Sequence, residues 1–168
     1  MIRAASPTDH GAIDVVVREA FDDAHVRLVH GIRSSGTLRW ELVGVDDAGD
    51  VVGHVIVSDM TIVETGETIC QLSPLGVRPS HQRRGLGGSL VRAVCELAEE
   101  AGEPVVVLEG SPDYYPRFGF EPATPLGIVL PLPDWAPPEA GQARRLRAWA
   151  TSPVRGTVQY TPPFDEFD

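Results

Sequence analysis

Near the middle of the chain the sequence reads Leu75-Gly76-Val77-Arg78-Pro79-Ser80-His81-Gln82-Arg83-Arg84-Gly85-Leu86-Gly87-Gly88. The apolar and β-branched residues before this junction predict a strand, and the apolar residues after it recur at helical spacing. Its glycines let the main chain approach a ligand closely, because no Cβ stands between the ligand and an amide. The first N–H groups of a helix lack internal partners and lie at the positive end of its dipole. The junction therefore predicts a phosphate-binding turn.

A plainer explanation of the glycine-rich turn is a loop that packs closely against a strand, which would show the same residues. Two other nucleotide-binding motifs are excluded. Leu90 stands where Gly-x-Gly-x-x-Gly needs its third glycine, and no Gly-Lys-Ser or Gly-Lys-Thr follows to form a P-loop. A phosphate site here therefore belongs to neither of those two classes.

The charge of the chain is acidic overall but unevenly distributed. There are 24 Asp and Glu against 14 Lys and Arg, for a formal net charge of -10, which argues against a nucleic-acid partner. The window from Thr68 to Cys95 nevertheless contains no acidic residue, and it carries Arg78, His81, Arg83, Arg84 and Arg92. A positive window in an acidic protein indicates a locally bound anion, with a chance fluctuation of composition as the alternative.

Length and composition indicate a single folded domain over residues 1–168. Hydrophobic residues make up 42% and charged residues 23%, as in ordinary globular proteins. No apolar run approaches the roughly 20 residues of a membrane span, and the first residues lack the pattern of a signal peptide, so we expect a cytoplasmic protein with no membrane partner. Cys70 and Cys95 lack the spacing of metal ligands and are expected to be two buried thiols.

The order of the expected elements is that of an α+β, or mixed α/β, protein. Ser6-Pro7-Thr8-Asp9 predicts a helix start, and Gly102 before Pro104 predicts a helix end. Segments rich in Val and Ile, separated by turn residues, predict a three-stranded antiparallel meander, which a helix and a buried strand follow. The expected strands are 2–4, 38–45, 51–59, 68–77 and 105–108, and the expected helices are 6–21, 24–33 and 90–101.

Two motifs resemble a known family. Gln82-Arg83-Arg84-Gly85-Leu86-Gly87 matches the Gln/Arg-x-x-Gly-x-Gly/Ala signature of the GCN5-related N-acetyltransferases (GNAT). Tyr115-Pro116-Arg117-Phe118-Gly119-Phe120 fits the Tyr-x-x-x-Gly-Phe element that this family carries further along the chain. Leu72-Ser73-Pro74-Leu75 is similar to the bacterial small-molecule branch. The resemblance covers about residues 2–160 and implies a mostly antiparallel central sheet, splayed between its fourth and fifth strands and flanked by helices.

The resemblance implies acetyl-CoA as the acetyl donor. Backbone groups of Leu75, Gly76 and Val77 would pair with the pantetheine arm as with an added strand, and Pro74, which removes a ladder donor, favours an interrupted or splayed strand there. The amides from Arg83 to Gly88 would hold the pyrophosphate, with the two arginines either adding charge or merely solvated. The cofactor-binding residues expected from the family are Leu75, Gly76, Val77, Gln82, Arg83, Arg84, Gly85, Leu86, Gly87 and Gly88.

The chemistry implied by the family is direct attack of an amine on the thioester in a ternary complex. The N–H of Val77 or its neighbour would stabilise the oxyanion. Tyr115 matches the family's general acid, which protonates the departing sulfur, although a tyrosine that only packs against the cofactor is the alternative. No acid lies in a base motif; Asp59, Glu64 and Glu109 are the available carboxylates. We expect His54 to be a hydrogen-bonded strand histidine and we assign no metal.

Several expectations stay open at the level of sequence. The Asn that the family often has before its tyrosine element is replaced by Gly110-Ser111-Pro112-Asp113, of which Ser111 substitutes only in part. The acceptor is a primary amine, on a small molecule or on a peptide or protein, and residues 22–40 and 121–142 are its expected walls. A non-catalytic acyl-CoA sensor of the same fold is the alternative function. Exposed sheet edges permit a homodimer.

Overall fold

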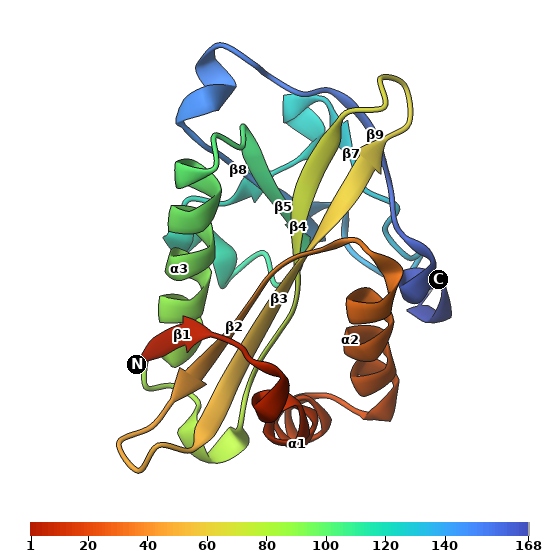
Figure 1. Cartoon of the computed structure of the whole chain (residues 1–168). Coiled ribbons are helices and arrows are strands. Elements are labelled where there is room, and N and C mark those ends of the chain that lie inside the picture. Colours follow the sequence, from red (N-terminus) through yellow and green to blue (C-terminus); the bar gives the residue numbers. More distant parts are fainter. Residues whose placement is uncertain (168) are drawn as a thin grey trace. The chain divides into compact units, whose positions relative to one another are not determined.

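The computed structural model, drawn in Figure 1, describes residues 1–167. These residues form two compact units. Unit 1 consists of Met1–Ser58 and Ser73–Val94, and unit 2 of Asp59–Leu72 and the chain from Cys95 onward. Strands β3 (Val51–Ile62) and β4 (Thr68–Val77) and helix α3 (Leu86–Glu100) each contribute residues to both. The expectation of a single domain over residues 1–168 stays a prediction.

Unit 1 is built on four neighbouring strands in the order β1-β2-β3-β4. The unit contains the whole of β1 (Ile2–Ala4), α1 (His10–Ala20), α2 (Asp23–Ser35) and β2 (Leu38–Val45). It also contains the first part of β3, the last part of β4 and the start of α3. β1 and β2, and β2 and β3, pair antiparallel, with Val43 opposite His54 and Gly44 opposite Gly53. The predicted ranges of β1, β2 and β4 are confirmed.

Capping interactions mark the start of the first N-terminal helix, and a glycine marks the end of the second. A short 3-10 helix, Pro7–Asp9, precedes α1, and the Asp9 carboxylate accepts hydrogen bonds from the Ser6 N–H at 2.8 Å and from the Arg3 guanidinium at 2.7 Å. This capping arrangement satisfies donors that the first helical turn leaves free. α2 ends at Gly36, whose φ of 79° lies in the left-handed region that a glycine adopts without strain. The predicted helices at 6–21 and 24–33 are confirmed within a few residues.

Helices cover both faces of the strands in unit 1. The apolar faces of α1 and α2, with Ile13, Val17, Val29 and Ile32 buried, lie on one side, and α3 lies on the other (Figure 1). Gly76 of β4 lies on the face that α1 covers, because a Cβ atom added to Gly76 would meet Ala20 at the end of α1. Val51–Ser58, the part of β3 in unit 1, is buried throughout, as expected of a strand covered by helices on both faces.

In unit 2, β5 (Val105–Glu109) pairs parallel with β4 at Cys70–Val106 and Gln71–Val107. β8 (Gly141–Arg145) pairs antiparallel with β5, and β6 (Glu121–Pro122) with β8. β9 (Gly156–Gln159) pairs antiparallel with the end of β3 and parallel with β7 (Ile128–Val129). The parallel β4–β5 pair within a mostly antiparallel sheet confirms the mixed α/β class.

Some predicted boundaries are wrong. β3 extends to Ile62 rather than to residue 59, because Thr61 and Ile62 pair with β9. No local pattern in the sequence predicts this pairing. α3 begins at Leu86 rather than 90. The assigned range of β4 runs through Pro74, so of the two expectations for this strand, interrupted or splayed, the interrupted one is wrong. Among the described residues the β4–β5 partners end at Gln71 and Val107, as expected of the splayed alternative.

No helix among residues 1–167 combines the length and the apolar character needed to cross a membrane.

Candidate functional site

The start of α3 is fixed against the sheet by a pair of glycines. Gly44 and Gly53 face each other in the β2–β3 register, and added Cβ atoms on them would lie 2.6 and 2.9 Å from the Leu86 side chain. Leu86 therefore occupies the space that two missing side chains leave. Its side chain faces the sheet, so its contribution to a ligand site is limited to the backbone. The result is a helix N-terminus that is held in place by packing.

The backbone of the turn leaves several amides available. The N–H of Ser89 bonds to the Gly85 carbonyl at 3.0 Å, so the N–H groups that precede it have no carbonyl within the helix to bond. Gly85 has φ of 86°, and an added Cβ there would meet no atom within 4 Å. Arg83 has φ of 63°, a conformation that costs an ordinary residue energy. The turn, residues 82–88, is called the cradle below.

The strand that leads into the cradle is tied to it by a side chain. The Gln82 amide donates to the Val77 carbonyl at 3.0 Å, which positions the cradle relative to the end of β4. Gly76, one residue earlier, approaches α1 closely, since an added Cβ would lie 3.1 Å from the Ala20 Cβ and 3.3 Å from the Phe21 ring. Gln82 therefore acts as a structural bridge in the cradle, and the Val77 carbonyl is already occupied by it.

Folding brings acids to part of the window that has none in sequence. Glu19 of α1 pairs with Arg78 at 2.6 Å, and Asp46 of the β2–β3 turn lies 3.4 Å from His81. Among residues 1–167, by contrast, the exposed guanidinium groups of Arg83 and Arg84 make no hydrogen bond or ion pair. The uncompensated positive charge is thus concentrated at the cradle itself, where it strengthens the field of the helix dipole.

Tyr115 lies in unit 2, at the start of a short 3-10 helix, Tyr115–Phe118. Its ring contacts Tyr114 edge-on at 5.0 Å and Phe120 at 5.8 Å. Burial raises the pKa of Tyr115 to about 12, with a smaller contribution from Tyr114, so the hydroxyl is protonated at neutral pH. That hydroxyl makes no hydrogen bond to any of residues 1–167, which leaves its proton available.

The loop before Tyr115 is shaped to receive its ring. An added Cβ on Gly110 would lie 2.4 Å from Cε2 of Tyr115, so the ring rests directly on the main chain. The buried Gln142 amide donates to the carbonyls of Gly110 and Ser111, both at 3.2 Å, and the Ser111 carbonyl also accepts from the Tyr114 N–H. In the segment where the family often has an Asn, this chain therefore has a loop on which the Tyr115 ring packs closely.

The three carboxylates named as candidate bases differ in their surroundings. Both carboxylate oxygens of Glu64 accept from the Thr157 N–H, at 2.8 and 3.2 Å. The Thr157 hydroxyl donates to the same carboxylate. These bonds lower the pKa of Glu64, which makes it a poor proton acceptor. Asp59 and Glu109 also have partners among the described residues.

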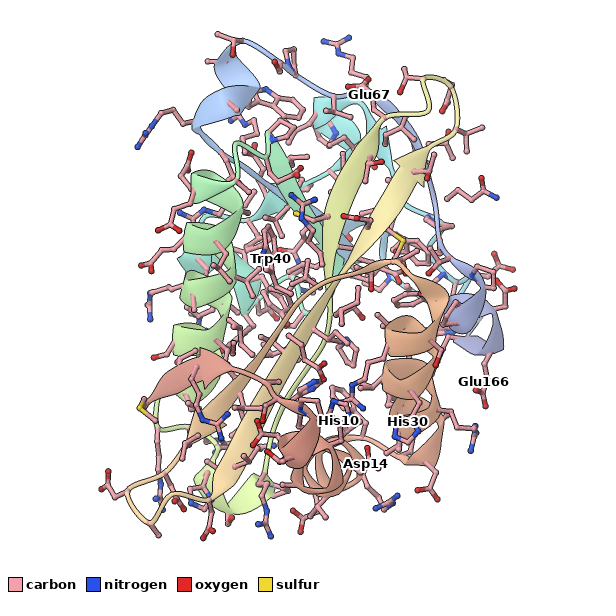
Figure 2. The ribbon with its side chains drawn as sticks, viewed as in Figure 1. His10, Asp14, His30, Trp40, Glu67 and Glu166 are labelled. Atoms are coloured by element: carbon pink, nitrogen blue, oxygen red, sulfur yellow. The ribbon has the colours of Figure 1, made fainter. Side chains whose placement is uncertain are left out.

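Sequence reasoning missed a buried charged cluster in unit 1. One oxygen of Glu41, on β2, lies 2.6 Å from Arg33 Nη2 and 2.9 Å from His54 Nε2 on β3. The side chains of Arg33, Glu41 and His54 are 14%, 7% and 0% exposed. Nearby, Asp14 of α1 and His30 of α2 are paired at 2.8 Å, and Figure 2 shows them together where the two helices meet. The hairpin register was the available signal, because it puts Glu41 diagonal to His54 on one face.

Ionisation within this cluster follows from its contacts. Burial by itself raises the pKa of the Glu41 carboxyl, but the hydrogen bonds from His54 and Arg33 lower it to about 2. Burial lowers the pKa of His54, against the opposing hydrogen bond to Glu41. At neutral pH the cluster therefore holds an ionised carboxylate, a guanidinium and a neutral imidazole.

The site residues predicted from the sequence fall into two groups. Leu75, Gly76, Val77 and the cradle residues Gln82, Arg83, Arg84, Gly85, Leu86, Gly87 and Gly88 are brought together in unit 1. Tyr115 belongs to unit 2 and is described there by itself.

Comparison with known proteins identifies the class. The family model described as an acetyltransferase (GNAT) domain matches residues 2–123. The chain belongs to the GNAT acetyltransferase family, as its two signatures predicted.

Individual relatives match along the whole chain. The uncharacterized N-acetyltransferase YhbS of Escherichia coli K12 is 34% identical over 168 residues, covering 99% of each chain. The crystal structure of E. coli YhbS in complex with CoA has a TM-score of 0.90 and covers 100% of this chain and 93% of that one, at 34% identity. A GNAT family acetyltransferase from Brucella melitensis in complex with acetyl-CoA has a TM-score of 0.79, is 27% identical and covers 98% and 97%. These likenesses confirm the predicted fold.

Proposed function

We propose that this protein transfers the acetyl group of acetyl-CoA to a primary amine by direct attack in a ternary complex. The observation that carries the proposal is the cradle: an α-helix N-terminus, held by Leu86 on a glycine pair, with free amides and two unpaired arginines. Such a turn suits a diphosphate, because backbone N–H groups and positive charge converge on it. The CoA and acetyl-CoA complexes of the two structural relatives support this choice of ligand.

The cradle residues fit the pyrophosphate of acetyl-CoA. The open space beside Gly85 leaves room for phosphate oxygens at the amides from Arg83 to Gly88, a space that a side chain at the glycines would fill. Arg83 and Arg84 add charge that no acid among residues 1–167 offsets. Backbone groups of Leu75 and Gly76 pair with the pantetheine arm as with an added strand, whereas the Val77 carbonyl stays with Gln82.

The chemistry that acetyl-CoA supplies is an activated thioester carbonyl. The Val77 N–H is the proposed donor to the negative charge that develops on the carbonyl oxygen, a preorganised role for which a backbone amide needs no rearrangement. Tyr115 is the proposed general acid that protonates the departing sulfur. Its raised pKa keeps the hydroxyl protonated at neutral pH, so the acid form of the side chain is the one that meets the departing thiolate.

The acceptor proposed is a primary amine, on a small molecule or on a peptide. The acidic balance of the chain, with a formal net charge of -10, favours a cationic acceptor, since long-range attraction raises the encounter rate. Ammonium groups are protonated at neutral pH, so one proton must leave the nitrogen before attack.

The test is release of free CoA thiol from acetyl-CoA with a panel of amines: putrescine, lysine methyl ester, tryptamine and a short peptide with a free N-terminus. Saturating acetyl-CoA is also expected to raise the melting temperature, because it binds the folded state alone. Thiol release above the blank with at least one amine supports acetyl transfer. A melting temperature that rises without any release would instead favour an acyl-CoA sensor, and no rise at all would refute both.

A further inference from the structure

The imidazole of His54 has one nitrogen that is satisfied and one that is not. Nε2 lies 2.9 Å from the Glu41 carboxylate, whereas Nδ1 is buried and has no hydrogen-bond partner among residues 1–167. The whole side chain is 0% exposed. An unpaired buried acceptor is costly, and in native proteins such a group requires an explanation, such as a bound water or a catalytic role.

The surroundings fix which nitrogen carries the proton. Glu41 is ionised, since Arg33 holds it with contacts of 2.6 and 3.1 Å, and an ionised carboxylate only accepts. The Nε2 of a neutral imidazole must therefore be the donor to Glu41, and Nδ1 carries the lone pair. A carboxylate that orients a histidine in this way, leaving the far nitrogen free, is the arrangement by which enzymes prepare a general base.

His54 also stands beside the strand segment that the proposed function assigns to the donor. The Arg78 N–H at the end of β4 bonds to the Val52 carbonyl of β3 at 2.9 Å, so His54, two residues further along β3, runs alongside Leu75–Val77. Adjacent strands are separated by only about 4.8 Å. Gly53 faces α3, so His54 points to the opposite face, which α1 and α2 cover.

The other candidates serve less well as proton acceptors. Glu64 is saturated by Thr157, and Asp14 is paired with His30 at the meeting of α1 and α2. Within the described part of the chain, the groups that face His54 are Glu41 from β2, Arg33 from α2 and Asp14 from α1, and of these Glu41 bonds to it.

We propose that His54 is the proton acceptor for the acceptor amine, acting through one water molecule held at Nδ1, with Glu41 and Arg33 as its positioning residues. This proposal rests on the proposed acetyl transfer and names the base that the sequence left open.

Every proton in the proposed reaction has a donor and an acceptor. The acceptor ammonium gives one proton to the water, the water gives one to Nδ1, and the imidazole becomes an imidazolium whose Nε2–H stays on Glu41. The freed nitrogen lone pair forms the N–C bond while the C–S bond breaks, and sulfur takes a proton from Tyr115. The nitrogen's second proton restores the tyrosine. The imidazolium releases its proton to solvent, so one ammonium and one thioester give one amide, one thiol and one proton.

The first test compares pH profiles of kcat/KM for the parent and for His54→Gln, with the amine that gives most thiol. Gln retains a donor for Glu41 but has no basic nitrogen. At pH 7 the variant should lose about 10² in turnover, and its rate should climb tenfold per pH unit up to the pKa of the amine, since only free amine then reacts. Affinity for acetyl-CoA should not change. His10→Gln, at the start of α1 and outside both the charged cluster and the expected acceptor walls, is the matched control and should keep the parent profile.

A second pair of variants separates positioning from packing. Glu41→Gln should reproduce the alkaline shift of the pH profile with KM for acetyl-CoA unchanged, and Glu41→Asp should restore part of the parent profile. In the full-length parent, long-range proton–nitrogen NMR of labelled histidines should show His54 with a proton on Nε2 and none on Nδ1 at pH 7. That measurement does not depend on variant folding.

The outcomes are distinct. If the parent is active and His54→Gln keeps the parent's pH profile with a turnover within threefold, this proposal alone is overturned. A proton found on Nδ1 of His54 at pH 7 would overturn it as well. A parent that binds acetyl-CoA but acetylates no amine would overturn the proposed function, and this proposal with it.

Discussion

Gly110 carries the Tyr115 ring against its own main chain: a Cβ added to Gly110 would lie 2.4 Å from Cε2 and 2.9 Å from Cδ2 of that ring. Gly110→Ala must therefore displace the tyrosine or strain the loop, at a cost of about 1–3 kcal/mol. We expect turnover to fall at least tenfold with acetyl-CoA affinity retained, measured by thiol release and by calorimetry. Gly11→Ala, where no atom lies within 4 Å, is the control and should behave like the parent.

Tyr115→Phe removes the proposed acid and keeps the ring. Turnover should drop by about 10² or more with little change in the affinity for acetyl-CoA, because the lost interaction belongs to the transition state. Tyr114→Phe deletes a hydroxyl one residue away and serves as the comparison. Steady-state kinetics on both variants decide the point: a Tyr115→Phe enzyme within a factor of two of the parent would remove the tyrosine from this role.

Gly87→Glu fills the cradle and adds a negative charge at a helix N-terminus that is proposed to bind a diphosphate. Acetyl-CoA should then no longer raise the melting temperature, whereas at 100 times the dissociation constant the parent gains about 2.7 kcal/mol. Gly11→Glu places the same side chain on α1 and controls for the added charge. Equal shifts in Gly87→Glu and in the parent would show that the ligand binds elsewhere.

Arg83 and Arg84 are neighbours with the same side chain but different backbones. Arg83 has φ of 63°, so Arg83→Gly relieves strain, whereas Arg84→Gly only loosens the unfolded chain. We expect Arg83→Gly to be the more stable of the two by about 1 kcal/mol in urea unfolding. Both should weaken acetyl-CoA binding if each guanidinium contacts phosphate. Identical stabilities would contradict the strain at Arg83.

Glu41 makes the stability of the fold sensitive to acid. Its folded-state pKa of about 2 is below its ordinary value of 4.5, so its contribution is complete above about pH 4.5 and is lost as the pH falls toward 2. Glu41→Gln leaves Arg33 without a counter-charge and should cost about 3 kcal/mol at pH 7, with a smaller difference from the parent at pH 3. Urea unfolding at several pH values measures this. Glu19→Gln breaks the exposed pair with Arg78 and should cost less than about 1 kcal/mol.

Much of the fold was predictable because its signals are local. Ser6 and Asp9 predict the start of the first helix, because their side chains can accept from its unpaired backbone N–H groups. Gly36 predicts the end of the second helix, because glycine adopts the left-handed conformation without strain. The strand at Leu38–Val45 follows from its Val-rich pattern before a turn. The short strands after residue 120, such as β6 and β7, have two residues each and exist only through their partners, so no pattern in the sequence marks them.

The candidate site was predictable where a motif carries it and not where packing does. The cradle and Tyr115 were named from contiguous signatures. Glu41 and His54 are separated in sequence by a strand turn and meet only through the hairpin register. His54 was expected to be a satisfied strand histidine, which is wrong for Nδ1 although right for Nε2. Likewise, Leu86 packs on Gly44 and Gly53, where the lack of side chains leaves room for it. The sequence shows the two glycines but not that Leu86 lies over them.

The burial of Cys70 and Cys95, at 0% and 3% exposure, has a practical consequence for all of these measurements. Burial also raises the pKa of the Cys95 thiol, which keeps it in its unreactive protonated form. A chromogenic disulfide reagent can therefore stay in the cuvette throughout a time course without consuming the native enzyme's own sulfhydryls. A sudden rise in colour before any amine is added would report unfolding, so one absorbance trace reads both catalysis and the integrity of the catalyst.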